Sequence, residues 1–263
     1  MTAVYLGIDI GSLAAKAVLL DADGRTAAWA VLPSGHDHPR VAAELTRVVL
    51  QDAGVGPDEL LGTVGTGYGR SSVAGAGRKV TEISCHARGA HALDPACRTV
   101  IDIGGQDSKV IRLDARGRVV DFAMNDRCAA GTGRFLEVMA HALEVPLERM
   151  GAAALAATRT ARISNVCTVF AESEVVGLIA GGEPRPNIVR GLCRSIAERV
   201  GAMAGHVGLA APVMMTGGVA LNRGVVAALE QQLGVPIELP ALPQIVGALG
   251  AAHLARDAEA AGE

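Results

Sequence analysis

Two spacings of apolar residues divide the first part of the chain into candidate strands and helices. Short runs in which almost every residue is apolar are typical of buried strands, whereas apolar residues three or four apart indicate amphipathic helices. Val41, Leu45, Val48 and Val49 have the helical spacing. The pattern predicts strands near residues 4–10, 15–20, 27–32 and 62–65, and helices near residues 39–53 and 84–93.

The same plan begins again near residue 99. A strand pair is expected up to about residue 122, a buried strand at 213–216, and helices near 133–143, 168–179, 188–207, 222–233 and 244–258. Alternating strands and helices in each half predict an α/β protein of two lobes, residues 1–98 and 99–263, with a cleft between them. This prediction leaves open that the last helix packs back on the first lobe.

One stretch of sequence occurs twice, which supports two similar lobes. GIDIGSLAAKAVLLDADGR at residues 7–25 recurs as VIDIGGQDSKVIRLDARGR at residues 100–118. Asp9, Gly11 and Lys16 are matched by identical residues in the second copy, namely Asp102, Gly104 and Lys109. Each copy is an apolar strand, a small polar turn, a second apolar run and a Gly-containing turn. Both copies therefore predict β-hairpins.

The turn of each hairpin is a candidate phosphate site. A strand that ends in Asp followed by Gly places a carboxylate and backbone N–H groups at one spot, which suits Mg²⁺ and phosphate oxygens. One copy alone is more typical of an ordinary tight hairpin, and it is the duplication that favours the site. The expected contacts are Asp9 and Asp102 to Mg²⁺ through water, and Gly11, Ser12, Gly104 and Gly105 to phosphate. Lys16 either neutralises phosphate charge or is a solvated strand lysine, and Gln106 and Asp107 either orient the attacking water or form a polar turn.

A third glycine-rich loop follows the buried strand at 213–216. Gly217 and Gly218 would let the backbone pass close to a flat ring, and Asn222 is a weaker candidate at the N-cap of the next helix. The three loops, in this order, resemble the phosphate-1, phosphate-2 and adenosine motifs of the actin, sugar-kinase and Hsp70 superfamily of ATPases. The resemblance implies a duplicated ribonuclease-H-like unit with an interlobe nucleotide cleft.

Composition argues against several classes of binding partner. With 24 Lys and Arg against 27 Asp and Glu the net charge is -3, and no basic block indicates nucleic acid or a membrane surface. No apolar stretch reaches the roughly 18 residues that span a bilayer, and no signal sequence is seen, so we expect a cytoplasmic protein. Five cysteines are an odd number and do not suggest a disulfide framework.

Cys128 and Cys167 are the better candidates for metal ligands, because a helix is expected after each and a helix N-terminus stabilises a thiolate. A four-iron cluster needs four thiolates, and no Cys-x-x-Cys motif supplies them. Two cysteines per subunit become four across a two-fold axis. The alternative is that both are small packing residues, which is the reading preferred for Cys85, Cys97 and Cys193.

Longer motifs narrow the family. IDIGGQD, MNDRCAAGTGRFLE, CTVFAESEV and MTGGVALNRGV resemble the ATP-dependent activators (component A) of 2-hydroxyacyl-CoA dehydratases, of the BadF/BadG/BcrA/BcrD type. The resemblance implies a homodimer with one [4Fe-4S] cluster bound by Cys128 and Cys167. It also implies an ATPase that passes a low-potential electron from ferredoxin or flavodoxin to a separate dehydratase (component D), which removes water from a 2-hydroxyacyl-CoA.

Three other functions remain open from the sequence. The nearest is an ATPase subunit of a benzoyl-CoA reductase, and the others are a small-molecule kinase without a cluster and a nucleotide-gated binding module without redox function.

The first loop departs from the superfamily pattern at one position, where Leu13 stands in place of a residue that is often Thr. The loss of that hydroxyl removes one phosphate contact and is expected to weaken nucleotide binding at most.

Overall fold

The structure is a computed structural model that describes residues 3–163 and 167–262. The chain forms two compact units, which we describe separately. The first comprises Met1–Cys97, Leu113–Val120 and Gln244–Glu263, and the second comprises Arg98–Arg112 and Asp121–Pro243. The last helix therefore belongs to the first unit although it ends the chain.

The first unit contains a five-stranded sheet in the order β3-β2-β1-β4-β5. Its first three strands form an antiparallel meander, and β4 and β5 are parallel to their neighbours. The four predicted strands all form, with ends within two residues of the prediction, and β5 was not expected. The bounds are β1 Val4–Ile10, β2 Ala14–Asp21, β3 Thr26–Pro33, β4 Leu60–Thr66 and β5 Arg78–Lys79.

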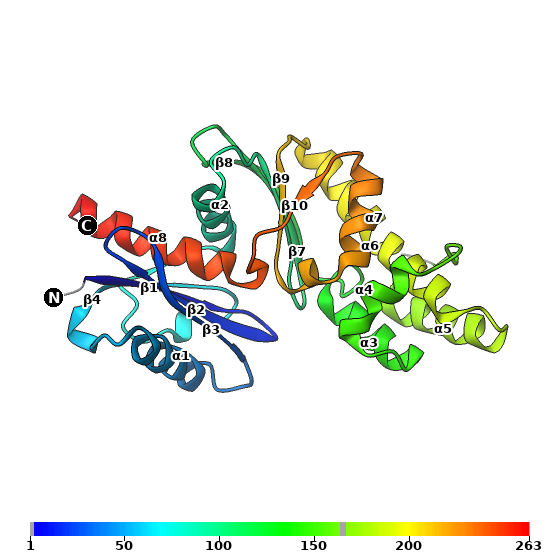
Figure 1. Ribbon diagram of the computed structural model, residues 1–263, viewed down its shortest axis with the longest axis horizontal. Coiled ribbons are helices and arrows are strands. Elements are labelled where there is room, and N and C mark those ends of the chain that lie inside the picture. Colours follow the sequence, from blue (N-terminus) through cyan, green and yellow to red (C-terminus); the bar gives the residue numbers. More distant parts are fainter. Residues whose placement is uncertain (1–2, 164–166, 263) are drawn as a thin grey trace. The chain divides into compact units, whose positions relative to one another are not determined.

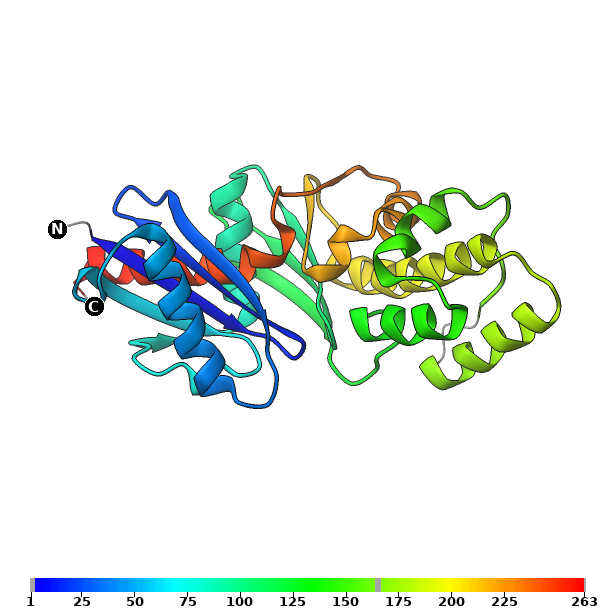
Figure 2. The ribbon, with the colours of Figure 1, turned by 60° about the horizontal axis from the view of Figure 1, so that its bottom comes forward.

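Helices cover both faces of this sheet (Figures 1 and 2). Because side chains of a strand alternate between faces, Leu6 and Ile8 pack with Leu45 of α1, whereas Tyr5 packs on the side of α8. At Gly7 a Cβ would lie 2.0 Å from the Ala248 carbonyl oxygen, so glycine is what lets α8 approach the strand. The bounds are α1 His38–Ala53, α2 Glu82–Leu93 and α8 Val246–Ala261.

The sheet of the second unit repeats this topology in the order β10-β9-β6-β7-β8. The β6-β7 hairpin is antiparallel and β9 runs parallel to β6, as β4 runs parallel to β1 in the first unit. The prediction of two β-hairpins is confirmed. The bounds are β6 Thr99–Ile103, β7 Ser108–Leu113, β8 Val119–Asn125, β9 Val213–Thr216 and β10 Ile237–Glu238.

In the described part of the chain, five helices accompany the second sheet, and each contributes at least two buried side chains to one large core. The four predicted helices form, but α4 was missed, because its nine residues are fewer than the window over which an apolar helical spacing can be recognised. Helix α6 begins three residues before its predicted start, with Pro186 in the first turn, where the missing N–H costs nothing. No helix within the described ranges is both long and apolar enough to cross a membrane. The bounds are α3 Gly133–Leu143, α4 Leu147–Leu155, α5 Thr168–Ala180, α6 Arg185–Val207 and α7 Arg223–Leu233.

Candidate functional site

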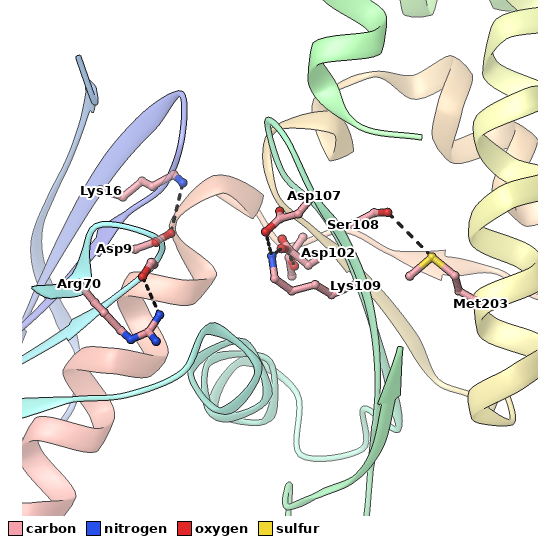
Figure 3. A network of polar contacts seen from close by, with 10 residues as sticks. Asp9, Lys16, Arg70, Asp102, Asp107, Ser108, Lys109 and Met203 are labelled. Carbon is pink, nitrogen blue, oxygen red and sulfur yellow. Dashed lines mark hydrogen bonds and ion pairs between the residues drawn. The ribbon is translucent and has the colours of Figure 1, made fainter. Parts of the chain in front are cut away.

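The first phosphate loop joins β1 to β2 and carries one ion pair. Asp9 and Lys16 are register partners across the hairpin, and Lys16 Nζ lies 3.2 Å from Asp9 Oδ2 (Figure 3). The Asp9 side chain is buried and that of Lys16 is 17% exposed. On the other side of the loop, the Ser34 hydroxyl donates to the Gly11 carbonyl oxygen at 2.6 Å. The lysine at this position therefore neutralises a buried carboxylate.

The second loop repeats the pair and adds a carboxylate. Lys109 Nζ lies 3.3 Å from Asp102 Oδ2 and 2.8 Å from Asp107 Oδ2 (Figure 3). The Lys109 side chain is only 2% exposed, and a lysine that deep inside a protein is found almost only where it is paired. One ammonium is thus shared between two carboxylates, whose oxygens are of the kind that a divalent cation such as Mg²⁺ prefers. Asp107, expected to orient water, lies 2.8 Å from this lysine.

Both loops close through a backbone hydrogen bond. The Gly11 amide donates to the Ala14 carbonyl at 3.2 Å, and the Gly104 amide donates to the Asp107 carbonyl at 2.9 Å. These two glycine amides are engaged within the turns, so N–H donation to a phosphate would come from the residues that follow them, such as Ser12 and Gly105. Gln106 lies at the exposed tip of the second turn.

The sequence repeat extends further than the two hairpins, to a feature that sequence reasoning missed. Strand β4 ends in Thr66 followed by Gly67, and strand β9 ends in Thr216 followed by Gly217. Asp9 is the register partner of Thr66, and Asp102 is the register partner of Thr216. A Thr-Gly pair directly after an apolar strand in each half was the signal that could have shown this.

The two glycines have the same backbone geometry. Gly67 has φ +91° and Gly217 has φ +84°, and a Cβ at either position would lie 2.4 Å from the carbonyl oxygen of Ile10 or Ile103 and within 2.7 Å of an aspartate oxygen. Each turn therefore packs directly on the end of the strand that carries the aspartate. In the first unit the Gly69 amide also donates to the Ile10 carbonyl at 2.9 Å.

The residues after these glycines differ between the units. Arg70 Nη1 donates to the Gly67 carbonyl at 3.2 Å, and Tyr68 beside it is 79% exposed. In the second unit Gly217 is buried and Gly218 is exposed. Asn222 caps α7, because its Oδ1 accepts from the Gly224 and Val225 amides at 3.0 and 3.2 Å. That oxygen is engaged by the helix, and only the amide nitrogen of Asn222 remains for a ligand.

The five cysteines fall into two groups by burial. Cys128 and Cys167 are partly exposed, and the remaining three, Cys85, Cys97 and Cys193, are buried. Burial raises the pKa of the Cys85 and Cys193 thiols to about 12, which keeps them protonated at neutral pH. The two cysteines expected to be ligands are thus the accessible ones among the five.

The two accessible cysteines have different local structures. Cys167 is the N-cap of α5, its side chain makes no capping hydrogen bond, and its carbonyl accepts the first helical bond from the Ala171 amide at 3.0 Å. Cys128 lies five residues before the start of α3, in a loop where Asn125 Nδ2 donates to its carbonyl at 2.8 Å. The helix N-terminus argument made for both cysteines therefore applies directly to Cys167 and less directly to Cys128.

The loop of Cys128 is connected to the second phosphate loop through the start of α3. The Gly133 amide donates to the Gly104 carbonyl at 2.9 Å, and the Arg134 amide donates to the Gly105 carbonyl at 2.7 Å. The first N–H groups of a helix have no intrahelical partner, and here the phosphate loop supplies the acceptors. A displacement of that loop would therefore reach the segment that carries Cys128.

A four-iron cluster usually needs more thiolates than the two accessible cysteines of one chain supply. Within the described part of the chain, no three Cys, His, Asp or Glu side chains form a group that could hold a metal ion. Two accessible thiols per chain are half of the usual set of four. The carboxylates of Asp9 and Asp102 also suit Mg²⁺, which prefers oxygen ligands.

Comparison with known proteins identifies the family. The model of the BadF/BadG/BcrA/BcrD ATPase family matches residues 6–255. The chain belongs to this ATPase family. Among its relatives, the activator of lactoyl-CoA dehydratase from Anaerotignum propionicum is 48% identical over 256 residues, covering 96% of this chain and 97% of that protein.

Two solved structures of dehydratase activators have the same fold. The component A of (R)-2-hydroxyglutaryl-CoA dehydratase from Acidaminococcus fermentans has a TM-score of 0.94 at 44% identity, covering 98% of this chain and 99% of that one. The activator of 2-hydroxyisocaproyl-CoA dehydratase from Clostridium difficile, solved with bound ADPNP, has a TM-score of 0.92 at 39% identity, covering 100% and 97%. The expected two-lobed α/β ATPase fold class is confirmed.

Two of the three alternative functions are represented by more distant proteins. One of the subunits of benzoyl-CoA reductase from Thauera aromatica is 33% identical, covering 95% of this chain and 92% of that protein. A sugar kinase of the ROK family from Streptomyces griseus has a TM-score of 0.61 at 14% identity, covering 97% and 99%, which is a likeness of fold alone. The activator reading is therefore favoured over the other two.

Proposed function

We propose that this protein is the ATP-dependent activator of a 2-hydroxyacyl-CoA dehydratase. In this role it couples ATP hydrolysis to the transfer of one electron to a separate dehydratase (component D). The observation that carries the proposal is the separation of its cysteines: Cys128 and Cys167 are accessible and the other three are buried. A nucleotide-binding kinase of the same fold would have no need for this pair.

The proposed cofactor is one [4Fe-4S] cluster per homodimer, held by Cys128 and Cys167 of each chain. Cys167 lies at the N-terminus of the 13-residue α5, where the helix dipole and the first-turn amides, which have no intrahelical acceptor, favour a thiolate. When bound, the cluster supplies a low-potential electron, which ferredoxin or flavodoxin would replenish. The residues of this chain hold the thiolates in place and link them to the nucleotide.

The proposed nucleotide contacts are those of the two loops and the Gly217-Gly218 turn. Asp9 and Asp102 would hold Mg²⁺ through water, and Gly11, Ser12, Gly104 and Gly105 would contact phosphate. Lys109 has two carboxylate partners, so Asp107 can keep it neutralised while Asp102 faces the cation. Gln106, at the exposed tip of its loop, would orient the attacking water, together with Asp107.

The proposed coupling uses the start of α3. A γ-phosphate that draws on the amides of the Gly104-Gly105 loop would shift the carbonyls that accept from Gly133 and Arg134. The α3 N-terminus follows Cys128 by five residues, so that shift would change the position of one cluster ligand. ATP and ADP would then hold the cysteine loop differently.

The test is iron and acid-labile sulfide per chain after anaerobic purification, with the oligomeric state of the same sample. About two irons and two sulfides per chain in a dimer are expected for one bridging cluster. Cys128→Ser and Cys167→Ser should each lose the cluster, and the matched control Cys193→Ala, at a buried cysteine of the same unit, should keep it. A protein that holds no iron after careful reconstitution contradicts the proposal.

A second experiment tests the coupling to ATP. Anaerobic redox titration with a 2-hydroxyacyl-CoA dehydratase present should show a potential or an electron-transfer rate that changes when ATP replaces ADP. If neither quantity depends on nucleotide, the protein is not an ATP-driven electron donor. Co-purification with a second, related ATPase subunit would instead favour a benzoyl-CoA reductase assembly.

A further inference from the structure

The carboxylate of Asp102 is held at both oxygens by side chains from the strands on either side of it. Thr216 Oγ1 donates to Oδ1 at 3.0 Å, and Lys109 Nζ lies 3.3 Å from Oδ2. All three residues are buried: Asp102 is 3% exposed, Lys109 2% and Thr216 0%. A carboxylate that is bound by side chains of two neighbouring strands in a closely packed interior is restricted to one orientation.

The corresponding threonine of the first unit does not make this bond. Thr66 is the register partner of Asp9, and it is as fully buried as Thr216. Among the described residues its hydroxyl has no hydrogen-bond partner of standard geometry, although it lies near enough to the Cys85 thiol to lower that thiol's pKa against the larger effect of burial. The same residue at the same register position therefore contacts the aspartate in only one unit.

Thr216 also has a particular place in the chain. It is the last residue of β9 and immediately precedes Gly217, whose amide donates to the Pro243 carbonyl at 2.9 Å. Its backbone leads into the turn proposed for the nucleoside, and its hydroxyl contacts the carboxylate proposed for the cation. A shift of that turn would thus be transmitted to Asp102 by a single side chain.

We propose that Thr216 is a positioning residue that orients the Asp102 carboxylate toward the Mg²⁺ of the bound nucleotide. The inference rests on the proposed nucleotide contacts and adds the residue that makes one of them effective. Thr216 touches neither nucleotide nor cation, and acts through Asp102. The affinity for nucleotide with Mg²⁺ should therefore depend on its hydroxyl, and the affinity for nucleotide without a divalent cation should not.

The experiment compares Thr216→Val, which keeps the shape and removes the hydroxyl, with Thr216→Ser, which keeps the hydroxyl. The full-length protein is titrated with a non-hydrolysable ATP analogue in Mg²⁺ and again in EDTA. Loss of one hydrogen bond to a charged group should weaken binding of Thr216→Val about tenfold in Mg²⁺ and less than about twofold in EDTA. Thr216→Ser should stay within about threefold of wild type in both buffers.

Thr66→Val is the matched control, because it makes the same change at the equivalent position where no carboxylate contact exists. It should bind the analogue as wild type does. Equal loss in Thr66→Val and Thr216→Val, or equal loss by Thr216→Val in Mg²⁺ and in EDTA, would mean a structural role only and would overturn the inference. If Thr216→Val does not fold, Thr216→Ala takes its place with the same expected results.

Asp102→Asn separates this inference from the proposal beneath it. If Asp102→Asn binds the analogue in Mg²⁺ as tightly as wild type, then Asp102 is not at the cation and the proposed nucleotide contacts fail. If Asp102→Asn loses the Mg²⁺-dependent binding while Thr216→Val retains it, the contacts stand and the role of Thr216 is wrong. A Mn²⁺ electron paramagnetic resonance spectrum with ADP that changes in Thr216→Val and not in Thr66→Val would give spectroscopic support.

Discussion

The two phosphate loops begin from the same sequence and are held by different neighbours. In the first unit Asp9 has one lysine partner, and the loop carbonyl of Gly11 is held by a serine hydroxyl. In the second unit Lys109 is shared between two aspartates, and the loop carbonyls accept from the first amides of α3. Duplication thus preserved the hairpin and its charge pair, and the contacts added around the second copy link it to the segment with Cys128.

The largest expected difference between the two copies is in how much stability is lost when the lysine is replaced. Lys109→Met would leave two aspartates without a counter-charge at a buried site and should destabilise the protein by about 3 to 5 kcal/mol. Lys16→Met leaves a single buried aspartate without its lysine and should cost less, about 2 kcal/mol. Urea unfolding of both variants measures the difference, and Arg47→Met, which breaks an exposed pair with Glu44, is the near-neutral control. Equal losses at Lys16 and Lys109 would show that Asp107 does not distinguish the copies.

The two Thr-Gly turns, by contrast, should lose similar amounts of stability when their glycine is replaced by alanine. Gly67→Ala and Gly217→Ala each place a Cβ 2.4 Å from a backbone carbonyl at positive φ. Each change should cost about 3 kcal/mol, because backbone must move to accept it. Gly54→Ala, also at positive φ but with open space around it, should cost only about 1 kcal/mol. Thermal unfolding compares the three, and a tolerated alanine at either turn would break the equivalence of the two units.

A smaller effect should distinguish the contact of the second phosphate loop with α3 from the contact of the first phosphate loop with Ser34. Gly133→Ala puts a Cβ 3.1 Å from the Gly104 carbonyl oxygen and disturbs the bond between the loop and α3. Loss of about 1 kcal/mol there should speed alkylation of Cys128 about fivefold in the cluster-free protein.

The counterpart change in the first unit is Ser34→Ala, which removes the hydrogen bond to Gly11. It should lower stability by about 1 kcal/mol and leave the Cys128 rate unchanged. Mass spectrometry of alkylated peptides gives the rate for Cys128 by itself. An unchanged rate in Gly133→Ala would contradict the link from phosphate loop to cysteine loop.

The smallest expected effect is on stability in acid, and it comes from His253 in the first unit. Burial, with Arg88 and Arg256 nearby, lowers the pKa of His253 to about 4, against the weaker effect of Asp257. The unfolded chain takes up the proton near the ordinary pKa of 6.5, so His253 should cost no stability above that pH and an increasing amount as pH falls toward 4. His253→Gln should show a smaller drop in thermal midpoint between about pH 7 and about pH 5 than wild type. An identical drop would mean that other groups carry the acid sensitivity.

Much of the fold could be predicted because local signals agreed with the final structure. The strands around Asp9 and Asp102 are apolar runs that end in a turn, and the helices with clear apolar periods were found close to their true ends. Helix α4 was missed because a helix of nine residues is too short for its apolar spacing to stand out in the sequence. Strands β5 and β10 are two residues long and owe their existence to the partner strand, which sequence pattern does not report.

By itself, the sequence determined the duplicated hairpins and the order of the three glycine-rich loops, and it singled out Cys128 and Cys167 as candidate ligands, because each is a matter of residue type and spacing. Only the tertiary structure decided which residues surround them. The alignment of Thr66 with Thr216 depends on strands that pair in parallel across long stretches of chain, and the burial of Lys109 between two aspartates depends on the packing above it. Identical short sequences received different partners because hydrogen bonds and burial are set by whatever the rest of the chain brings to them.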